Sequence, residues 1–203
     1  MDILLSILIC TIPSRTSIFL RKLIESLEEQ IYLLEKDLQN KVEILYLGDN
    51  RKMTVGEKRN KLIDISHGKY IVFIDDDDRI NCKYIYEIIL AIYNYRSNSV
   101  NDVDSVTFDA EITFDGVNPC RVFYSKDLID VNDPTNHKYF RKTNHLMPIK
   151  KEIVVKNKVQ FPEKNKGEDF DWAQRIVTHL KSEAKIDKIL YYYDYNSNTT
   201  TTL

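Results

Sequence analysis

Four consecutive aspartates, Asp75 to Asp78, follow a short apolar run and are the strongest chemical signal in the sequence. Adjacent carboxylates repel one another, and a divalent cation relieves that repulsion. Oxygen ligands suit Mg²⁺ or Mn²⁺, and Mg²⁺ usually takes one or two protein carboxylates and fills its other positions with water and phosphate oxygens. The tetrad therefore predicts a site for a metal ion and a diphosphate. An acidic turn before a helix is the simpler alternative.

A second group of acids, Glu168, Asp169 and Asp171, stands where a helix is predicted to begin, beside Phe170 and Trp172. Acids at a helix start are stabilised by free N–H groups and by the helix dipole, which requires no catalytic role. A carboxylate here could also accept a proton from an attacking hydroxyl, because an alcohol is a poor nucleophile until a base takes its proton. The residues alone leave both interpretations open.

The pattern of apolar residues places the aspartate tetrad at the end of a strand. Apolar runs over 3–10, 42–47 and 70–74 predict strands buried in a parallel sheet. Apolar residues at spacings of three and four predict helices over 20–38 and 55–67. Strands that alternate with helices indicate a doubly wound α/β sheet, in which ligands bind at the carboxyl ends of the strands.

The sequence also predicts where the helices begin and end, and it predicts shorter elements in the second half of the chain. Gly68 is predicted to end the second helix, and Asn81 to cap a third over 84–93. A further helix is predicted over 170–180, and short strands are predicted over 103–108, 111–114, 121–124, 146–150 and 186–195.

Two polar segments have no clear periodicity. Residues 125–144 are long for a structureless loop, so they are either a mobile functional segment or an unrecognised part of the fold. The polar tail Asn196–Leu203 is expected to fray. The sequence does not tell whether either segment acts as a lid.

Composition excludes several classes of protein. The chain has 203 residues, with 29 Lys and Arg against 31 Asp and Glu, so its net charge of −2 gives no general basic excess for nucleic-acid binding. Five glycines and five prolines exclude a collagen-like or low-complexity chain. The apolar opening is too short to span a membrane, and it is not preceded by the basic residues of a signal peptide. Three distant cysteines form no disulfide framework and indicate a reducing, cytoplasmic environment.

Four blocks of sequence, taken together and in this order, resemble a family-2-type glycosyltransferase with the GT-A fold. They are SILICTIPSR (Ser6–Arg15), VEILYLGDN (Val42–Asn50), GEKRNKLIDISHGKYIVFIDDDD (Gly56–Asp78) and GEDFDW (Gly167–Trp172). The resemblance covers nearly the whole chain. It implies a single α/β domain over 1–203, with a mostly parallel, Rossmann-like sheet flanked by helices and a smaller mixed sheet on the acceptor side. Residues 1–100 would form the nucleotide-sugar-binding half, and 101–203 the half that holds the acceptor and the catalytic base.

The resemblance also implies roles for residues that bind the donor. The turn of Thr11, Ile12, Pro13 and Arg15 matches the one that lies against the nucleobase and phosphates. Asp49 matches an acid that pairs with the uracil edge, which points to a uridine donor.

Further residues match the positions that surround the diphosphate and the base. Lys58 and Arg59 match the basic positions near the diphosphate, although Arg59 could instead pair with the aspartates. Asp75 and Asp76 resemble the ribose-side and sugar-side acids, and Asp77 resembles the ligand of the Mn²⁺ or Mg²⁺ ion. Asp169 resembles the general base, and Glu168 resembles its neighbour that positions the acceptor or the base. Asp78 could simply cap the following helix.

The activity implied by the resemblance is transfer of a sugar from a nucleoside-diphosphate sugar, with UDP as the expected nucleotide, to an acceptor hydroxyl with inversion. The acceptor is not identified by the sequence: a glycan, a lipid-linked intermediate, a protein side chain or a modified nucleic-acid base each offers a hydroxyl. The four histidines lack metal-ligand spacing and are predicted to lie on the surface or in turns. One of them, His145, lies roughly where the family places acceptor-side residues.

Three other functions fit parts of the pattern. A sugar nucleotidyltransferase would usually have a glycine-rich loop after the first strand, and Thr11–Arg15 contains no glycine. A metal-dependent nuclease would spread its acids over separated strands and benefit from a basic surface. A non-catalytic module that only binds a nucleotide sugar is opposed by the presence of both Asp77 and Asp169.

Overall fold

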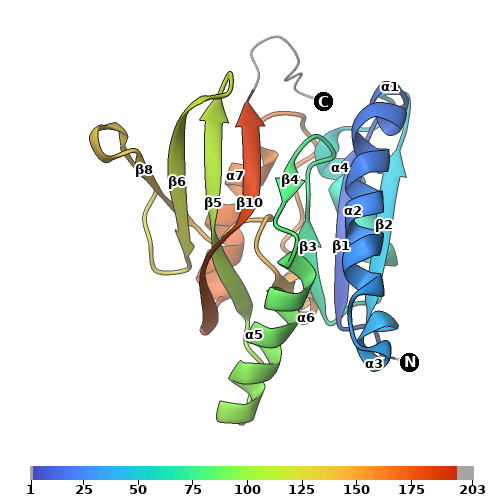
Figure 1. Ribbon diagram of the computed structural model, residues 1–203, viewed down its shortest axis with the longest axis vertical. Coiled ribbons are helices and arrows are strands. Elements are labelled where there is room, and N and C mark those ends of the chain that lie inside the picture. Colours follow the sequence, from blue (N-terminus) through green and yellow to red (C-terminus); the bar gives the residue numbers. More distant parts are fainter. Residues whose placement is uncertain (1, 196–203) are drawn as a thin grey trace.

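A mixed ten-stranded sheet runs through the computed structural model, which describes residues 2–195 (Figure 1). The tail considered above as a possible lid lies outside the described residues. The strands are β1 (Leu5–Thr11), β2 (Val42–Gly48), β3 (Tyr70–Phe73), β4 (Arg79–Ile80), β5 (Ser105–Phe114), β6 (Val117–Ser125), β7 (Val131–Asp133), β8 (Lys138–Lys142), β9 (Ile149–Lys150) and β10 (Glu183–Tyr195). The α-helices are α1 (Pro13–Arg15), α2 (Arg21–Tyr32), α3 (Lys36–Gln39), α4 (Val55–Ile65), α5 (Tyr84–Asn98), α6 (Lys151–Lys156) and α7 (Glu168–Ile176). A π-helical segment (Thr16–Leu20) joins α1 to α2, and short 3₁₀ turns cover Pro134–Asn136 and Val177–His179.

Three parallel strands, in the order β2-β1-β3, form the first part of the sheet. Every residue of β1 is buried, as expected for a central strand covered on both faces. The prediction that β2 is equally buried is wrong. Among the described strands it pairs only with β1, and Tyr46 on it is 57% exposed, because β2 forms the edge of the sheet.

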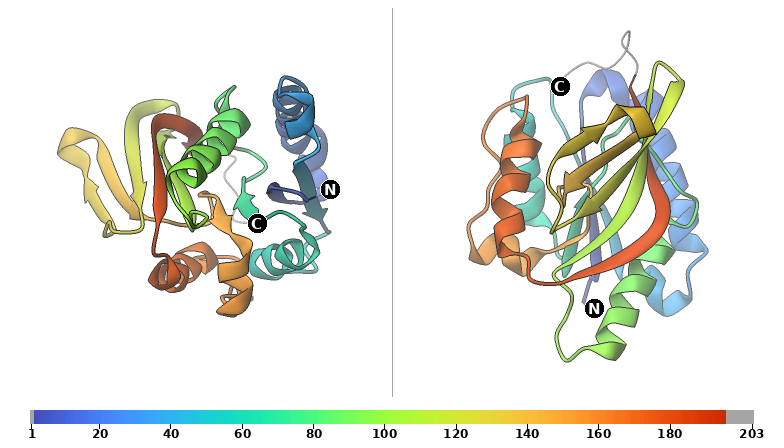
Figure 2. Two further views of the ribbon diagram at one scale, coloured as in Figure 1. Left: turned by 90° about the horizontal axis from the view of Figure 1, so that it is seen from below. Right: turned by 90° about the vertical axis from the view of Figure 1, so that its left-hand side faces the viewer.

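Helices cover both faces of the sheet. Figure 2 (left) shows α2 and α5 on one side and α4, α6 and α7 on the other. Side chains of β1 alternate between the two cores: Leu5, Ile7 and Ile9 pack in the first cluster, and Leu8 and Cys10 pack in the second. The alternation follows from the two-residue period of a strand, and it confirms the α/β layering expected from the sequence.

The second part of the sheet is mixed, in the order β3-β9-β5-β6-β8-β7, and β10 lies parallel to β5. The two strands predicted over 103–108 and 111–114 form the single long strand β5. Residues 125–144, expected to be either a mobile segment or an unrecognised part of the fold, contain β7, a 3₁₀ turn and β8. The segment is therefore part of the sheet. It was not recognised in the sequence because strands of three and five residues are too short to give a clear period.

Three local predictions about helices are wrong. The helix expected over 20–38 is interrupted after Tyr32 and resumes as α3. Gly68 does not cap α4, which ends at Ile65 with Ser66 as its C-cap. A Cβ atom at Gly68 would lie 2.4 Å from Oγ of Ser6, so the residue permits a close approach to β1. Asn81 lies two residues before Lys83, the N-cap of α5, and its side chain accepts a hydrogen bond from the Lys83 backbone N–H (3.0 Å).

Helix α4 holds the loop that leads into α7. The Asn60 side chain donates to the Phe161 carbonyl (2.9 Å) and accepts from the Phe161 N–H (2.8 Å). One turn earlier, a Cβ atom added to Gly56 would lie 1.9 Å from the Pro162 carbonyl oxygen. The backbones of α4 and this loop therefore touch, and only glycine allows that approach.

We predict that Gly56→Ala lowers the free energy of unfolding by about 2 to 3 kcal/mol, because the backbone contact must open to admit a methyl group. Gly116→Ala is the control, since Gly116 has a positive φ of 75° but no atom within 4 Å of the added Cβ, and it should cost about 1 kcal/mol. Urea unfolding of both variants measures the difference. An equal or smaller loss for Gly56→Ala would contradict this account of the contact.

Candidate active site

The four aspartates after β3 are separated by their partners. Asp76 accepts a hydrogen bond from the Thr11 hydroxyl (2.6 Å) and forms an ion pair with Arg15 (2.8 Å). Arg15 also pairs with Asp77. The turn after β1 thus lies directly against the second and third acids of the tetrad.

The fourth acid, Asp78, accepts a hydrogen bond from the Tyr191 hydroxyl of β10 (2.5 Å). The same hydroxyl oxygen accepts from the backbone N–H of Asp75 (3.2 Å). Asp78 therefore does not cap α5. Sequence reasoning missed this contact, because Tyr191 lies in a strand-like run of tyrosines and carries no local signal that distinguishes it from a core aromatic.

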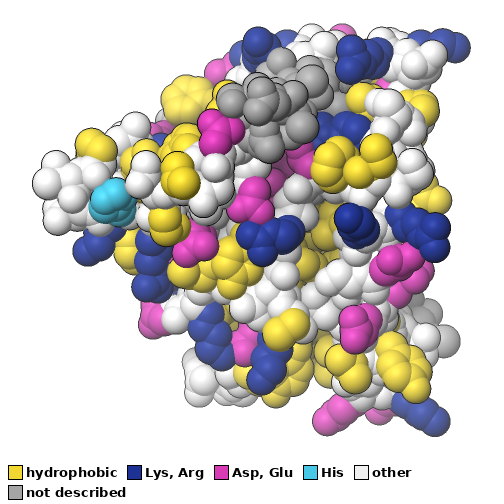
Figure 3. Space-filling view, turned by 45° about the horizontal axis from the view of Figure 1, so that its top comes forward, with side chains coloured by type: hydrophobic (Ala, Val, Ile, Leu, Met, Phe, Trp, Pro, Cys, Tyr) yellow, Lys and Arg dark blue, Asp and Glu magenta, His cyan; other side chains and the backbone are white. Residues whose placement is uncertain are grey.

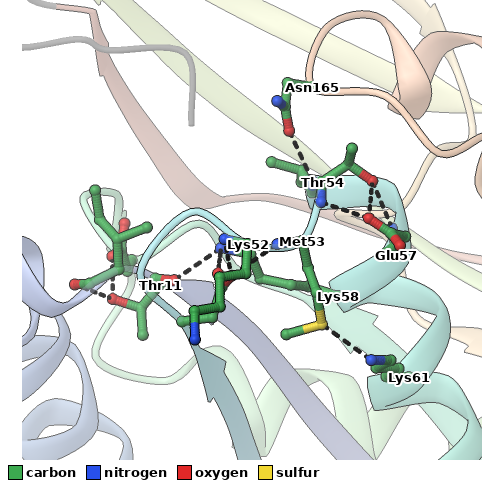
Figure 4. Close-up of polar contacts among 12 residues, drawn as sticks. Thr11, Lys52, Met53, Thr54, Glu57, Lys58, Lys61 and Asn165 are labelled. Carbon is green, nitrogen blue, oxygen red and sulfur yellow. Dashed lines mark hydrogen bonds and ion pairs between the residues drawn. The ribbon is translucent and has the colours of Figure 1, made fainter.

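A buried lysine joins the end of β2 to the end of β1. Lys58 is 1% exposed; its ammonium group lies 2.8 Å from Asp49 and donates to the Thr11 carbonyl (3.0 Å). Figure 4 shows Lys58 beside Thr11, with the N-terminal cap of α4 at Thr54 and Glu57 close by. Burial alone would raise the pKa of Asp49, but hydrogen bonds from Lys58 and from the backbone of Met53 and Lys52 lower it.

Arg59 connects the two acidic motifs. Its guanidinium lies 3.1 Å from Asp75, which follows β3, and 3.1 Å from Glu168, which begins α7. The arginine is 4% exposed. Burial alone would lower its pKa, but Asp75, Cys10 and Glu168 raise it above its ordinary value. The pairing with an aspartate, which the sequence offered as the alternative role of Arg59, is present.

Aromatic rings surround the Arg59 guanidinium. It lies over the rings of Phe73 (5.5 Å) and Phe161 (5.3 Å). Phe161 in turn stacks on Trp172 with ring centroids 4.7 Å apart. These rings are buried, so Trp172 belongs to the core and not to the wall of a binding site. The arrangement fixes the guanidinium between the two carboxylates.

A cavity of about 340 Å³ opens between the tetrad and α7. Asp75 and Asp169, from the two acidic motifs, both line it. Its other lining residues are Asp78, Ala110, Glu111, Ile112, Val122, Tyr124, Asp130, Arg141, Lys142, Asn144, His145, Leu146, Phe170, Ala173, Tyr191 and Tyr193. Figure 3 shows acidic and basic side chains intermixed with hydrophobic ones on one face of the molecule.

The pKa values of buried acids near the cavity are shifted. Burial raises the pKa of Asp76 to about 6, against the opposing effects of Thr11 and Arg15. Burial also raises the pKa of Glu168, and Arg59 partly offsets that effect. The structure thus holds several carboxyl groups in one place by pairing them with buried cations.

The residues predicted to bind the donor come together only in part. Thr11, Arg15, Asp49 and Lys58 form the connected network described above, with Asp76 and Asp77. Ile12 contributes only its backbone: its carbonyl accepts from the Arg15 N–H (2.9 Å) and the Thr11 hydroxyl (3.4 Å), while its side chain is buried. Pro13 is exposed at the start of α1.

Of the residues predicted on the acceptor side, Asp169 and His145 line the cavity, and Glu168, paired with Arg59, does not. Asp169 faces it, and Phe170 beside it is 56% exposed and also lines it.

His145 lies in a turn, which the Met147 N–H closes onto the Asn144 carbonyl (3.1 Å), as one of the two predicted alternatives has it. It does not lie on the surface, because it is 4% exposed. The apolar residues around it gave no sequence signal, since they come from β3 and from the loop before α7.

Comparison with known proteins identifies the fold. No family model and no curated protein matches the chain. The crystal structure of S. aureus TarS 1–349 in complex with UDP superposes with a TM-score of 0.69 at 15% identity, over 96% of this chain and 61% of that one. TarS 1–349 in complex with UDP-GlcNAc superposes with a TM-score of 0.65 at 14% identity, over 98% of this chain and 62% of that one.

These similarities establish the GT-A-like α/β fold that the sequence resemblance implied. The chain spans about 60% of the length of TarS 1–349. In a longer TarS structure it spans 37%. Within residues 2–195, no helix has both the length and the apolar character needed to cross a membrane.

We predict that Arg59→Met lowers the free energy of unfolding by about 3 kcal/mol or more, because Glu168 is left buried without its cation. The control is Arg21→Met, which removes an exposed pair with Glu25 and should cost about 0.5 kcal/mol or less. Urea unfolding of the two variants tests the difference. Similar losses in both would mean that the Arg59 pairs contribute no more than a surface pair.

Proposed function

We propose that this chain is a glycosyltransferase domain that moves a sugar from a nucleoside-diphosphate sugar, with UDP as the nucleotide, to an acceptor hydroxyl with inversion. The observation that carries the proposal is the cavity that Asp75 and Asp169 share, one acid from each motif. The fold supports it as well, since UDP and UDP-GlcNAc are bound in two of the similar TarS structures.

The donor would lie along the ends of β1, β2 and β3. Asp49 is the candidate partner of the nucleobase, and Arg15 is the candidate cation of the diphosphate region. Lys58, implied by the resemblance to lie near the diphosphate, is 1% exposed and bound to Asp49 and the Thr11 carbonyl, so it positions Asp49 instead.

Arg59 has a different role from the one the sequence resemblance implied. With its guanidinium buried between Asp75 and Glu168, it positions these two acids and is not free to bind phosphate.

In the reaction, Asp169 accepts the proton of the acceptor hydroxyl while the hydroxyl oxygen forms a bond to the anomeric carbon of the sugar. The bond from that carbon to the diphosphate oxygen breaks on the opposite face, and the nucleoside diphosphate leaves with the electron pair. Glu168 does not face the acceptor freely, because Arg59 holds it; it fixes the start of α7 and with it the place of Asp169. The residues of the cavity wall keep donor and acceptor in line.

A divalent metal fits the donor set at the tetrad. Among residues 2–195 no three His, Cys, Asp or Glu side chains converge into a ready-made metal cage. Mg²⁺ and Mn²⁺ in phosphate-binding sites need only one or two carboxylates, and the side chain of Asp77 is 27% exposed and supplies one. When bound, the metal would neutralise charge on the leaving diphosphate. Asp77 would hold it, with Arg15 as the neighbouring cation that pairs with the same carboxylate in this structure.

We predict that Asp169→Asn lowers kcat by about 100-fold or more and leaves the Kd for UDP within about twofold, because only the proton acceptor is lost. Asp171→Asn is the matched control on the same helix, since Asp171 pairs with Lys164 and does not line the cavity. Release of UDP from UDP-sugars, with and without candidate acceptors, gives kcat, and calorimetry gives Kd. Normal turnover by Asp169→Asn would exclude Asp169 as the base. No turnover and no UDP binding by the unmodified protein would exclude the transferase.

Asp77→Ala should abolish the part of UDP affinity that depends on Mn²⁺, because the carboxylate that holds the ion is removed. Asp187→Ala, at an exposed position on β10, is the control and should behave as the unmodified protein. Calorimetric titrations of UDP with and without Mn²⁺ measure both. A gain from Mn²⁺ that survives in Asp77→Ala would assign the metal to other ligands, and the absence of any gain in the unmodified protein would exclude a metal role.

A further inference from the structure

His145 is a buried polar residue without a polar partner. Neither ring nitrogen has a hydrogen-bond partner among the described residues, and the residue is 4% exposed. Its ring packs near those of Phe73 (6.2 Å) and Phe161 (6.4 Å). A buried polar group left unpaired costs about 1 to 3 kcal/mol, so an apolar residue would suit this position better for stability alone.

The position of His145 indicates a function that would explain why the protein keeps this destabilising residue. His145 lines the cavity together with Asp75 and Asp169. Its backbone carbonyl accepts a hydrogen bond from the N–H of Phe73 (2.9 Å), so it lies against the last residue of β3, just before the tetrad.

The cavity is lined by both buried and exposed residues. Asp78 and Tyr191, which line the cavity with His145 and hydrogen-bond to each other, are buried, at 7% and 0% exposure. Phe170 and Asp130, which also line the cavity, are exposed. The part of a donor that follows the diphosphate into the cavity is its sugar, whereas an acceptor must enter from solvent. The part of the cavity lined by buried residues therefore suits the sugar ring, and the part lined by exposed residues suits the acceptor.

We propose that His145 binds a hydroxyl group of the sugar that is transferred and so contributes to the choice of sugar. This inference rests on the proposed function. Because both nitrogens are buried, the imidazole must turn toward the cavity to bind, and the sugar then supplies the partner that the protein does not.

A neutral imidazole suits this role, because it offers one N–H donor and one acceptor nitrogen to a hydroxyl. Burial lowers the pKa of His145 well below its ordinary value, and the nearby Arg59 cation lowers it further. Arg59 is the cation whose charge acts on the ring, and the other charged residues that line the cavity with His145 are Asp75, Asp78, Glu111, Asp130, Arg141, Lys142 and Asp169.

The test compares two ligands that differ only by the sugar. Calorimetry with Mn²⁺ measures the Kd of UDP and of UDP-GlcNAc, UDP-GalNAc, UDP-glucose and UDP-galactose, and the UDP-sugar that the unmodified protein binds most tightly is carried forward. His145→Phe should weaken binding of that UDP-sugar about tenfold and leave the Kd of UDP within about twofold. His145→Leu replaces His145→Phe if the larger ring does not fold. His145→Gln, which keeps a donor and an acceptor, should recover most of the affinity.

Two controls separate binding from folding. The melting temperature of His145→Phe or His145→Leu should equal or exceed that of the unmodified protein, because two unpaired polar atoms are removed. His179→Gln, at an exposed position beyond α7, should change neither Kd.

Each other outcome has a definite meaning. An unchanged Kd for the UDP-sugar in the apolar variant, or an equal loss for UDP and the UDP-sugar, would overturn the inference and leave the proposed function intact. UDP binding without binding of any UDP-sugar by the unmodified protein would overturn the inference and would also count against transfer from a UDP-sugar. No binding of UDP or of any UDP-sugar would reject the proposed function itself.

Discussion

The guanidinium of Arg59, buried between Asp75 and Glu168, is the interaction on which the arrangement of the site depends. One carboxylate follows a central strand, and the other begins a helix near the end of the chain. Two buried or half-buried acids could not stay this close without a cation, since each would be desolvated and would repel the other. A single arginine offsets both the desolvation of the two acids and their repulsion. The tetrad and α7 can therefore lie on two sides of one cavity.

Helix α4 carries this arginine and also fixes the loop that precedes α7. The paired hydrogen bonds of Asn60 with Phe161 and the contact of Gly56 with Pro162 act on that loop, while the rings of Phe73 and Phe161 limit where the guanidinium can lie. The same helix supplies Lys58, which ties the ends of β1 and β2 together. Packing and electrostatics thus converge on one helix, and the chemistry at either side of the cavity depends on its position.

Much of the fold was predictable from the sequence, because its signals are local. The apolar runs of β1 and β3 and the apolar spacing of α2 and α4 predict strands and helices directly, and the position of the tetrad after β3 predicts a site at the edge of the sheet. The strands within 125–144 were not predictable, since β7 and β8 are short and are stabilised by pairing with each other and with β6. Likewise, the contact of Tyr191 with Asp78 and the burial of His145 depend on segments far apart in the sequence.

A double-mutant cycle between Asp75 and Glu168 tests the central claim, that these two acids form one electrostatic unit on Arg59. The free energy of unfolding is measured for Asp75→Asn, for Glu168→Gln and for the double variant. When one acid is removed, the other keeps the guanidinium and is freed from repulsion, so each single change is mild. The account predicts that the double variant loses about 1 kcal/mol or more beyond the sum of the single losses. Strictly additive losses would show that the two motifs do not share Arg59 and would contradict the account.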